Sequence, residues 1–105
     1  MKQINNDTER QLEKIKGILK DLKREIRNKY RAELLGIFGS FARGEQTSKS
    51  DLDVLVLFDT DATLFDFVGL AIFLEEKLGI KVDIVPQDTL RKEIKEKVLS
   101  DVVPL

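Results

Sequence analysis

The sequence predicts an α/β (α+β) protein, in which helices pack against one small mixed β-sheet. Segments with apolar residues at helical spacing alternate with short, continuously apolar runs, and glycine or proline follows most of these runs. Such an alternation is typical of helices layered on a sheet. The 105 residues suffice for one hydrophobic core but not for two, so we expect a single domain over residues 1–105.

The composition is that of a globular protein and excludes several kinds of chemistry. Hydrophobic residues make up 42% of the chain and charged residues 35%, so the chain is not of the disordered class. It has no cysteine and no histidine, which rules out disulfides, thiolate or histidine catalysis, and zinc held by these residues. Any metal site must therefore use oxygen ligands, as Mg²⁺, Mn²⁺ and Ca²⁺ prefer.

The first expected element is an amphipathic helix over residues 6–30. Its apolar side chains recur three or four positions apart and form one stripe: Leu12, Ile15, Leu19, Leu22 and Ile26. Such a stripe usually packs on the core of its own domain. The alternative, a coiled-coil seam, needs a partner helix.

Two strands joined by a tight turn come next. Residues 34–38 form a short apolar run that ends at Gly39, and residues 40–43 should start a short helix that Gly44 stops. After a polar loop, residues 52–58 are apolar on both faces. This pattern predicts a central strand that is covered on both sides.

A second long helix is expected over residues 61–78, capped by Thr60 or Asp61 and ended by Gly79. Apolar residues cover most of its circumference, which is unusual for a domain of this size. The helix is therefore either buried on all sides or faces a partner, which would be a second copy of the chain or another protein.

The last third of the chain completes the sheet. Residues 80–85 form an apolar strand that contains Asp83 and ends at Pro86. We expect a third long helix over residues 88–100, capped by Asp88, and an edge strand in residues 102–105, where proline is tolerated.

Three carboxylates carry the chemical signal. Asp51 and Asp53 lie two residues apart at the start of a strand, so both project from the same face. Each acid has an ordinary structural explanation, since Asp51 and Asp53 can be a solvated strand end and Asp83 can form an ion pair or lie at a strand edge. Three carboxylates on apolar strands after Gly39-Ser40 are harder to explain by packing alone, because buried charges are costly unless they are paired or bound to metal.

These residues resemble a known signature. Gly39-Ser40, ten residues, and then Asp51-Leu52-Asp53 match the pattern of the DNA-polymerase-β-like nucleotidyltransferase superfamily. The runs GSFARG (residues 39–44) and SDLDVLV (residues 50–56), with the later strand VDIV, are similar to the minimal nucleotidyltransferases. The resemblance covers nearly the whole chain.

The resemblance implies a site for a metal-bound nucleotide. Asp51, Asp53 and Asp83 would be the catalytic carboxylates and would ligate two Mg²⁺ ions, or Mn²⁺ in their place. Asp83 would bind the catalytic metal or accept the proton of the attacking hydroxyl. Gly39 and Ser40 would bind the β- and γ-phosphates. Arg43 would pair with a phosphate, or alternatively with Asp51 or Glu45.

The resemblance also implies a reaction and a partner. Proteins of this family are commonly paired with a small helical toxin of the HEPN class, and the nucleotidyltransferase is then the antitoxin and can transfer AMP from ATP to a tyrosine of its toxin. No second domain is expected in this chain, so the acceptor surface would be small or supplied by another subunit, and a homo-oligomer stays open. The alternatives are an antitoxin that neutralises by contact alone and an enzyme that modifies a small molecule; the presence of all three acids favours the enzyme.

The expected location is the cytoplasm. The N-terminus is polar, and no apolar run reaches the roughly 18 residues that a membrane helix needs. With a net charge of −1, the chain has no bulk attraction to nucleic acid, so we expect no direct binding to it.

Overall fold

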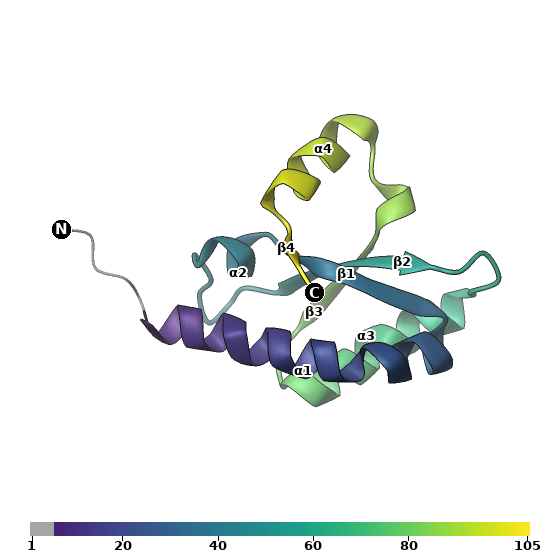
Figure 1. The fold of residues 1–105 in the computed structure, drawn as a ribbon, viewed down its shortest axis with the longest axis horizontal. Coiled ribbons are helices and arrows are strands. Elements are labelled where there is room, and N and C mark those ends of the chain that lie inside the picture. Colours follow the sequence, from purple (N-terminus) through teal and green to yellow (C-terminus); the bar gives the residue numbers. More distant parts are fainter. Residues whose placement is uncertain (1–5) are drawn as a thin grey trace.

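The structure is a computed structural model that describes residues 6–105 (Figure 1). It confirms the predicted class, since four strands form one mixed sheet with helices packed on it. The elements are α1 (Asn6–Tyr30), β1 (Ala32–Phe38), α2 (Ser40–Arg43), β2 (Leu52–Phe58), α3 (Leu64–Leu78), β3 (Val82–Pro86), the 3-10 turn η1 (Gln87–Thr89), α4 (Lys92–Asp101) and β4 (Val103–Pro104). Among these residues, no helix is both long enough and apolar enough to cross a membrane.

The sheet places β2 near its centre, as the sequence predicted. The strand order is β3-β2-β1-β4, in which β1 runs antiparallel to β2 and β4, and β2 runs parallel to β3. The expected edge strand is β4, which pairs with Gly36 and Ile37 of β1. A Cβ at Gly36 would overlap the backbone oxygen of Val103, so glycine allows this close approach.

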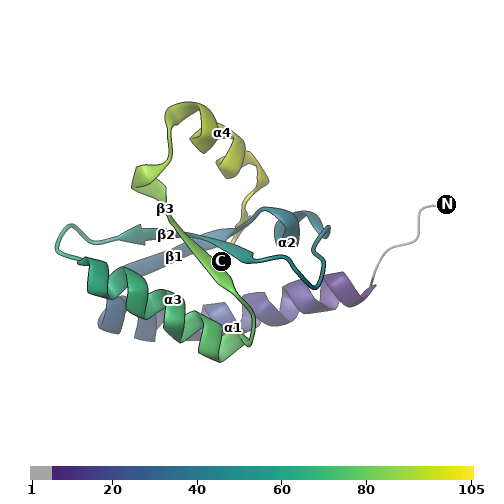
Figure 2. The same cartoon turned by 180° about the vertical axis from the view of Figure 1, so that it is seen from behind.

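Helices α1 and α3 lie side by side on one face of the sheet (Figures 1 and 2). The apolar stripe of α1 packs into the core as predicted, with Ile15, Leu19 and Ile26 buried. The core continues through the buried sheet residues that face these helices, which include Leu34, Ile37, Leu52, Val54, Val56, Val82 and Ile84. The stripe is therefore used for packing within the chain.

Helix α3 differs from its prediction in two ways. It begins at Leu64 rather than at residue 61, and its cap is Thr63, which forms a capping box with Asp66 (Thr63 N to Asp66 Oδ2, 2.8 Å). The caps expected at Thr60 or Asp61 are thus wrong, because Thr63 makes the reciprocal pair with an acid three residues later. Of the two alternatives left open for this helix, burial on all sides is excluded, since only Leu70 and Leu74 of it are buried.

The helix expected over residues 88–100 is shorter. Residues 87–89 form the turn η1, in which Thr89 Oγ1 donates to the carbonyl of Pro86 (2.8 Å) and Leu90 N donates to that of Gln87 (3.2 Å). Leu90 and Arg91 are extended, so Asp88 caps no helix and α4 starts at Lys92. Helix α4 lies on the sheet face opposite α1 and α3, and none of its residues is buried (Figure 1).

Candidate active site

The parallel pairing of β2 and β3 brings two of the predicted acids together. Asp53 and Asp83 are direct partners in the register of these strands. Their neighbours Leu52, Val54 and Val82 point into the core beneath the helices, so alternation along the strands turns both carboxylates to the face that carries α4. Two acids from distant parts of the sequence therefore meet at one edge of the sheet.

Gly39 lies against this pair. Phe38, the last residue of β1, is the partner of Asp53 in the antiparallel register, so the turn after β1 starts beside the carboxylates. Gly39 has φ 75° and ψ −151°, a region that only glycine adopts readily, and a Cβ on it would overlap Asp53 Oδ2. Helix α2 then starts at Ser40, within the same turn. Glycine is required here both for the backbone conformation and for the space that Asp53 fills.

The environment of Asp53 disfavours its negative charge. Burial, followed by the charge of Asp83, a hydrogen bond with it and the charge of Asp51, raises the pKa of Asp53 to about 6. Arg43 acts in the opposite direction but is the smallest of these causes. A half-buried carboxyl that faces other carboxylates lacks a cation, and a divalent ion would supply one.

Asp51 is exposed and directly precedes β2. Hydroxyl side chains in the loop before it accept hydrogen bonds from the backbone of the same loop. Thr47 N donates to Ser50 Oγ (2.9 Å), and Lys49 N donates to Thr47 Oγ1 (3.2 Å). Asp51 acts on Asp53 through its charge. Within residues 6–105, however, no three acidic side chains are gathered closely enough to form a ready-made metal site. The structure thus joins Asp53 and Asp83 directly and leaves Asp51 at their edge.

Arg43 is surrounded by three acidic residues. Its Nε donates to Glu45 Oε1 at 2.7 Å, and this hydrogen bond is the main cause that raises the pKa of Arg43. The charges of Asp101, at the end of α4, and of Asp53 add to the shift. Of the two roles left open from the sequence, the ion pair with Glu45 is the one seen here. The guanidinium nevertheless lies within electrostatic reach of the acid pair.

A pocket of about 480 Å³ opens beside Asp51 and is lined by residues that the sequence reasoning left out of the site. Lys49 and Lys81 both line it, together with hydroxyls of the loop before β2. Lys81 lies next to Asp51 because Leu52 N donates to the carbonyl of Lys81 (2.9 Å). Their proximity follows from the register of β2 and β3, which is a long-range property. Two ammonium groups near Asp51 can attract an anionic nucleotide.

Comparison with known proteins identifies the family of this chain. The nucleotidyltransferase domain family matches residues 8–104. A protein adenylyltransferase MntA from Thermococcus cleftensis is 40% identical to the chain over 88% of its length and 93% of the relative's length. The solved structure of a putative minimal nucleotidyltransferase matches 100% of both chains with a TM-score of 0.73 and 35% identity.

A second solved structure, a toxin–antitoxin with AMP-PNP, has a TM-score of 0.64 and 26% identity and covers 89% of this chain and 70% of that one. The match of the family to almost all of the chain, and the 40% identity to a full-length relative, leave one conclusion. The chain belongs to the nucleotidyltransferase domain family, as one of its minimal members.

Proposed function

We propose that this chain transfers AMP from ATP to a hydroxyl group of a partner toxin and so acts as the antitoxin of the pair. The observation that carries the proposal is the pairing of Asp53 with Asp83 beside Gly39. Two kinds of relative support it: an adenylyltransferase at 40% identity and a toxin–antitoxin structure with AMP-PNP.

The donor atoms at this edge fit a hard divalent cation. They are carboxylate oxygens, which Mg²⁺ and Mn²⁺ prefer, and burial, followed by the charge of Asp83, raises the pKa of Asp53 in this site. Asp51, Asp53 and Asp83 would hold the metal, and we propose two Mg²⁺ ions. When bound, the metal would stabilise charge on the attacking and leaving oxygens of an in-line displacement.

The other residues would place the triphosphate. The first amides of α2, at Ser40 and after, have no acceptor within the helix, and Gly39 lets the backbone come close to phosphate oxygens. Arg43 would exchange Glu45 for a phosphate, since a guanidinium pairs well with either. These roles would use the glycine, the hydroxyl and the arginine that follow β1 within five residues.

The reaction is a displacement at the α-phosphorus of ATP. The acceptor oxygen forms a bond to this phosphorus, the bond to the bridging oxygen of the β-phosphate breaks, and pyrophosphate leaves. Asp83 is the carboxylate that we assign to the proton of the acceptor hydroxyl. The product is the partner with AMP on the hydroxyl oxygen.

We further propose that the chain works as a one-domain enzyme in the cytoplasm, where ATP is supplied, and that its partner is a helical toxin of the HEPN class. The similar toxin–antitoxin structure supports a partner of this kind. The carboxylates lie on the sheet face that carries α4, and none of the residues of α4 is buried.

A transfer assay tests the proposal. The chain is incubated with the HEPN-type protein encoded beside it, Mg²⁺ and ATP labelled at the α-phosphate, and the toxin is analysed for label. We expect label on the toxin with the wild type and at least about a thousandfold less with Asp53→Asn. Equal neutralisation of the toxin by wild type and Asp53→Asn, without label in either, would instead identify an antitoxin that acts by contact.

A further inference from the structure

The outward side of α3 carries a continuous apolar surface. Leu64, Phe65, Val68 and Ile72, which we call the outer face of α3, lie at spacings that place them on one side of the helix. Leu70 and Leu74 are on the opposite side and are fully buried in the core. Phe65 is 88% exposed and Leu64 is 75% exposed. Packing within this chain therefore does not account for these residues.

The outer face is held rigidly. The capping box of Thr63 and Asp66 fixes the first turn of α3, and Gly79 ends the helix in a left-handed conformation with its N–H bonded to the carbonyl of Glu75 (2.8 Å). A rigid helix loses little conformational entropy when it binds. Contiguous exposed apolar residues on such an element are typical of a protein interface.

The two ends of the outer face differ in charge. Asp61 lies just before α3, where its carboxylate is paired with Arg31 (2.9 Å), and Glu76 lies exposed on its last turn. The Asp61 end is therefore neutralised within the chain, whereas Glu76 is an acidic group that a lysine or arginine on a partner would match.

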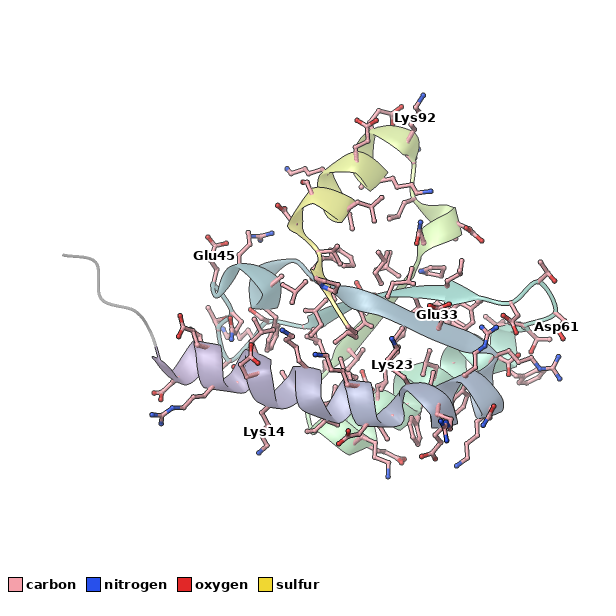
Figure 3. The ribbon with its side chains drawn as sticks, in the orientation of Figure 1. Lys14, Lys23, Glu33, Glu45, Asp61 and Lys92 are labelled. Atoms are coloured by element: carbon pink, nitrogen blue, oxygen red, sulfur yellow. The ribbon has the colours of Figure 1, made fainter. Side chains whose placement is uncertain are left out.

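The outer face is separate from the candidate active site. Asp53 lies at the start of β2, and α3 begins after the far end of this strand. Figure 3 labels one residue near each region: Glu45, the partner of Arg43, and Asp61, just before α3. These two residues lie at opposite ends of the sheet. A protein bound to α3 would therefore leave the Asp53–Asp83 edge accessible.

We propose that the outer face of α3 is the docking surface for the partner toxin, which binds it through the apolar side of a helix that carries a basic residue opposite Glu76. The proposal rests on the toxin partner of the proposed function and adds where that partner binds. The exposed carboxylate of Glu76 favours a basic residue on the partner, and the similarity to a toxin–antitoxin structure supports a toxin as that partner.

Matched pairs of exposed residues test this surface. Phe65→Gln/Ile72→Gln changes the outer face, and Ile94→Gln/Leu99→Gln changes α4, where the residues are 50% and 42% exposed, close to the 53% of Ile72. Binding of the HEPN-type protein encoded beside the chain is measured by calorimetry. We expect Kd to rise about tenfold or more with the α3 pair and less than about threefold with the α4 pair.

A charge variant and two further readouts make the test specific. Glu76→Lys should weaken binding by about threefold to tenfold, and more at low salt, if the toxin is basic at this end. Asp53→Asn should bind the toxin like the wild type. Label on the toxin should fall with the α3 pair at limiting toxin and recover at saturating toxin, which is an effect on KM rather than on kcat.

Three results would overturn the docking proposal. They are unchanged binding by the α3 pair, a wild-type complex with Kd weaker than about 1 mM, and a wild-type dimer that the α3 pair converts to a monomer. The docking proposal and the proposed function fail separately. If the α3 pair loses binding while the wild type transfers no AMP, the docking surface stands and the enzymatic function fails.

Discussion

The Asp53–Asp83 edge and the outer face of α3 differ in what their elements contribute to the protein. At the edge, paired strands hold two carboxylates against each other and against a glycine whose backbone conformation other residues rarely adopt, and the close, half-buried carboxylates cost stability. On α3, a well-capped helix exposes apolar residues that contribute little to the fold. Substitutions at the first region should therefore change catalysis and stability together, whereas those at the second should change binding alone.

The largest effect is expected from the acid that the sheet register brings to Asp53. Asp83→Asn should lower kcat for AMP transfer by about a hundredfold to a thousandfold, since it removes both a metal ligand and the proposed proton acceptor. Asp88→Asn, in the turn η1 just beyond β3, is the matched control and should leave kcat unchanged. Equal losses from both variants would show that charge near β3, rather than this position, matters.

Gly39→Ala should harm both activity and stability. Its backbone has φ 75°, and the new methyl group would displace Asp53, so we expect about 1–3 kcal/mol lower unfolding free energy and about a hundredfold lower kcat. Gly79→Ala is the control, because Gly79 has φ 70° but open space around its Cβ. It should lose stability by about 1–2 kcal/mol and keep its kcat. Thermal unfolding and initial rates separate the two effects.

Arg43→Gln should raise KM for ATP about tenfold, since the guanidinium would no longer pair with a phosphate. Glu45→Gln removes the partner that Arg43 has here and should leave KM the same or lower it. Neither change should alter the midpoint of thermal unfolding, because both side chains are exposed. A higher KM in Glu45→Gln would mean that the ion pair positions Arg43 for catalysis.

The smallest effect concerns pH. The pKa of Asp53 is raised from 3.8 to about 6, so the folded state binds its proton more tightly than the unfolded state does. The resulting stability is present below pH 3.8 and is lost as the pH rises through about 6. In the metal-free protein, Asp53→Asn should reduce the fall in unfolding free energy between about pH 4.5 and 7.5 by about 1 kcal/mol, after allowance for screening by solvent. Chemical denaturation at the two pH values measures this difference.

Local signals in the sequence predicted much of the fold. The stripe of α1, the glycines after β1, α2 and α3, and the apolar run of β2 depend on neighbouring residues, so periodicity and turn residues suffice to find them. The expected starts of α3 and α4 were wrong, because the backbone N–H of Thr63 donates to Asp66 Oδ2 and Thr89 Oγ1 donates to the carbonyl of Pro86, and these local hydrogen bonds compete with the expected caps.

The candidate site was predictable as a set of residues but not as an arrangement. The spacing of Asp51 and Asp53 and the glycine upstream mark the chemistry, and β1 pairs with β2 as expected. The direct pairing of Asp53 with Asp83, and the place of Lys81 beside Asp51, depend on the register of two parallel strands that a helix separates in sequence. Single-residue patterns do not encode such a register.

One titration tests most directly whether these acids hold a metal-bound nucleotide. ATP with Mg²⁺ is titrated into the wild type and into Asp51→Asn/Asp53→Asn at about pH 8, where Asp53 is ionised. We expect the wild type to bind ATP only with Mg²⁺ and the double variant to bind at least about a hundredfold more weakly. Equal binding by the two proteins, or binding by the wild type that needs no divalent ion, would contradict the assignment of the site to these carboxylates.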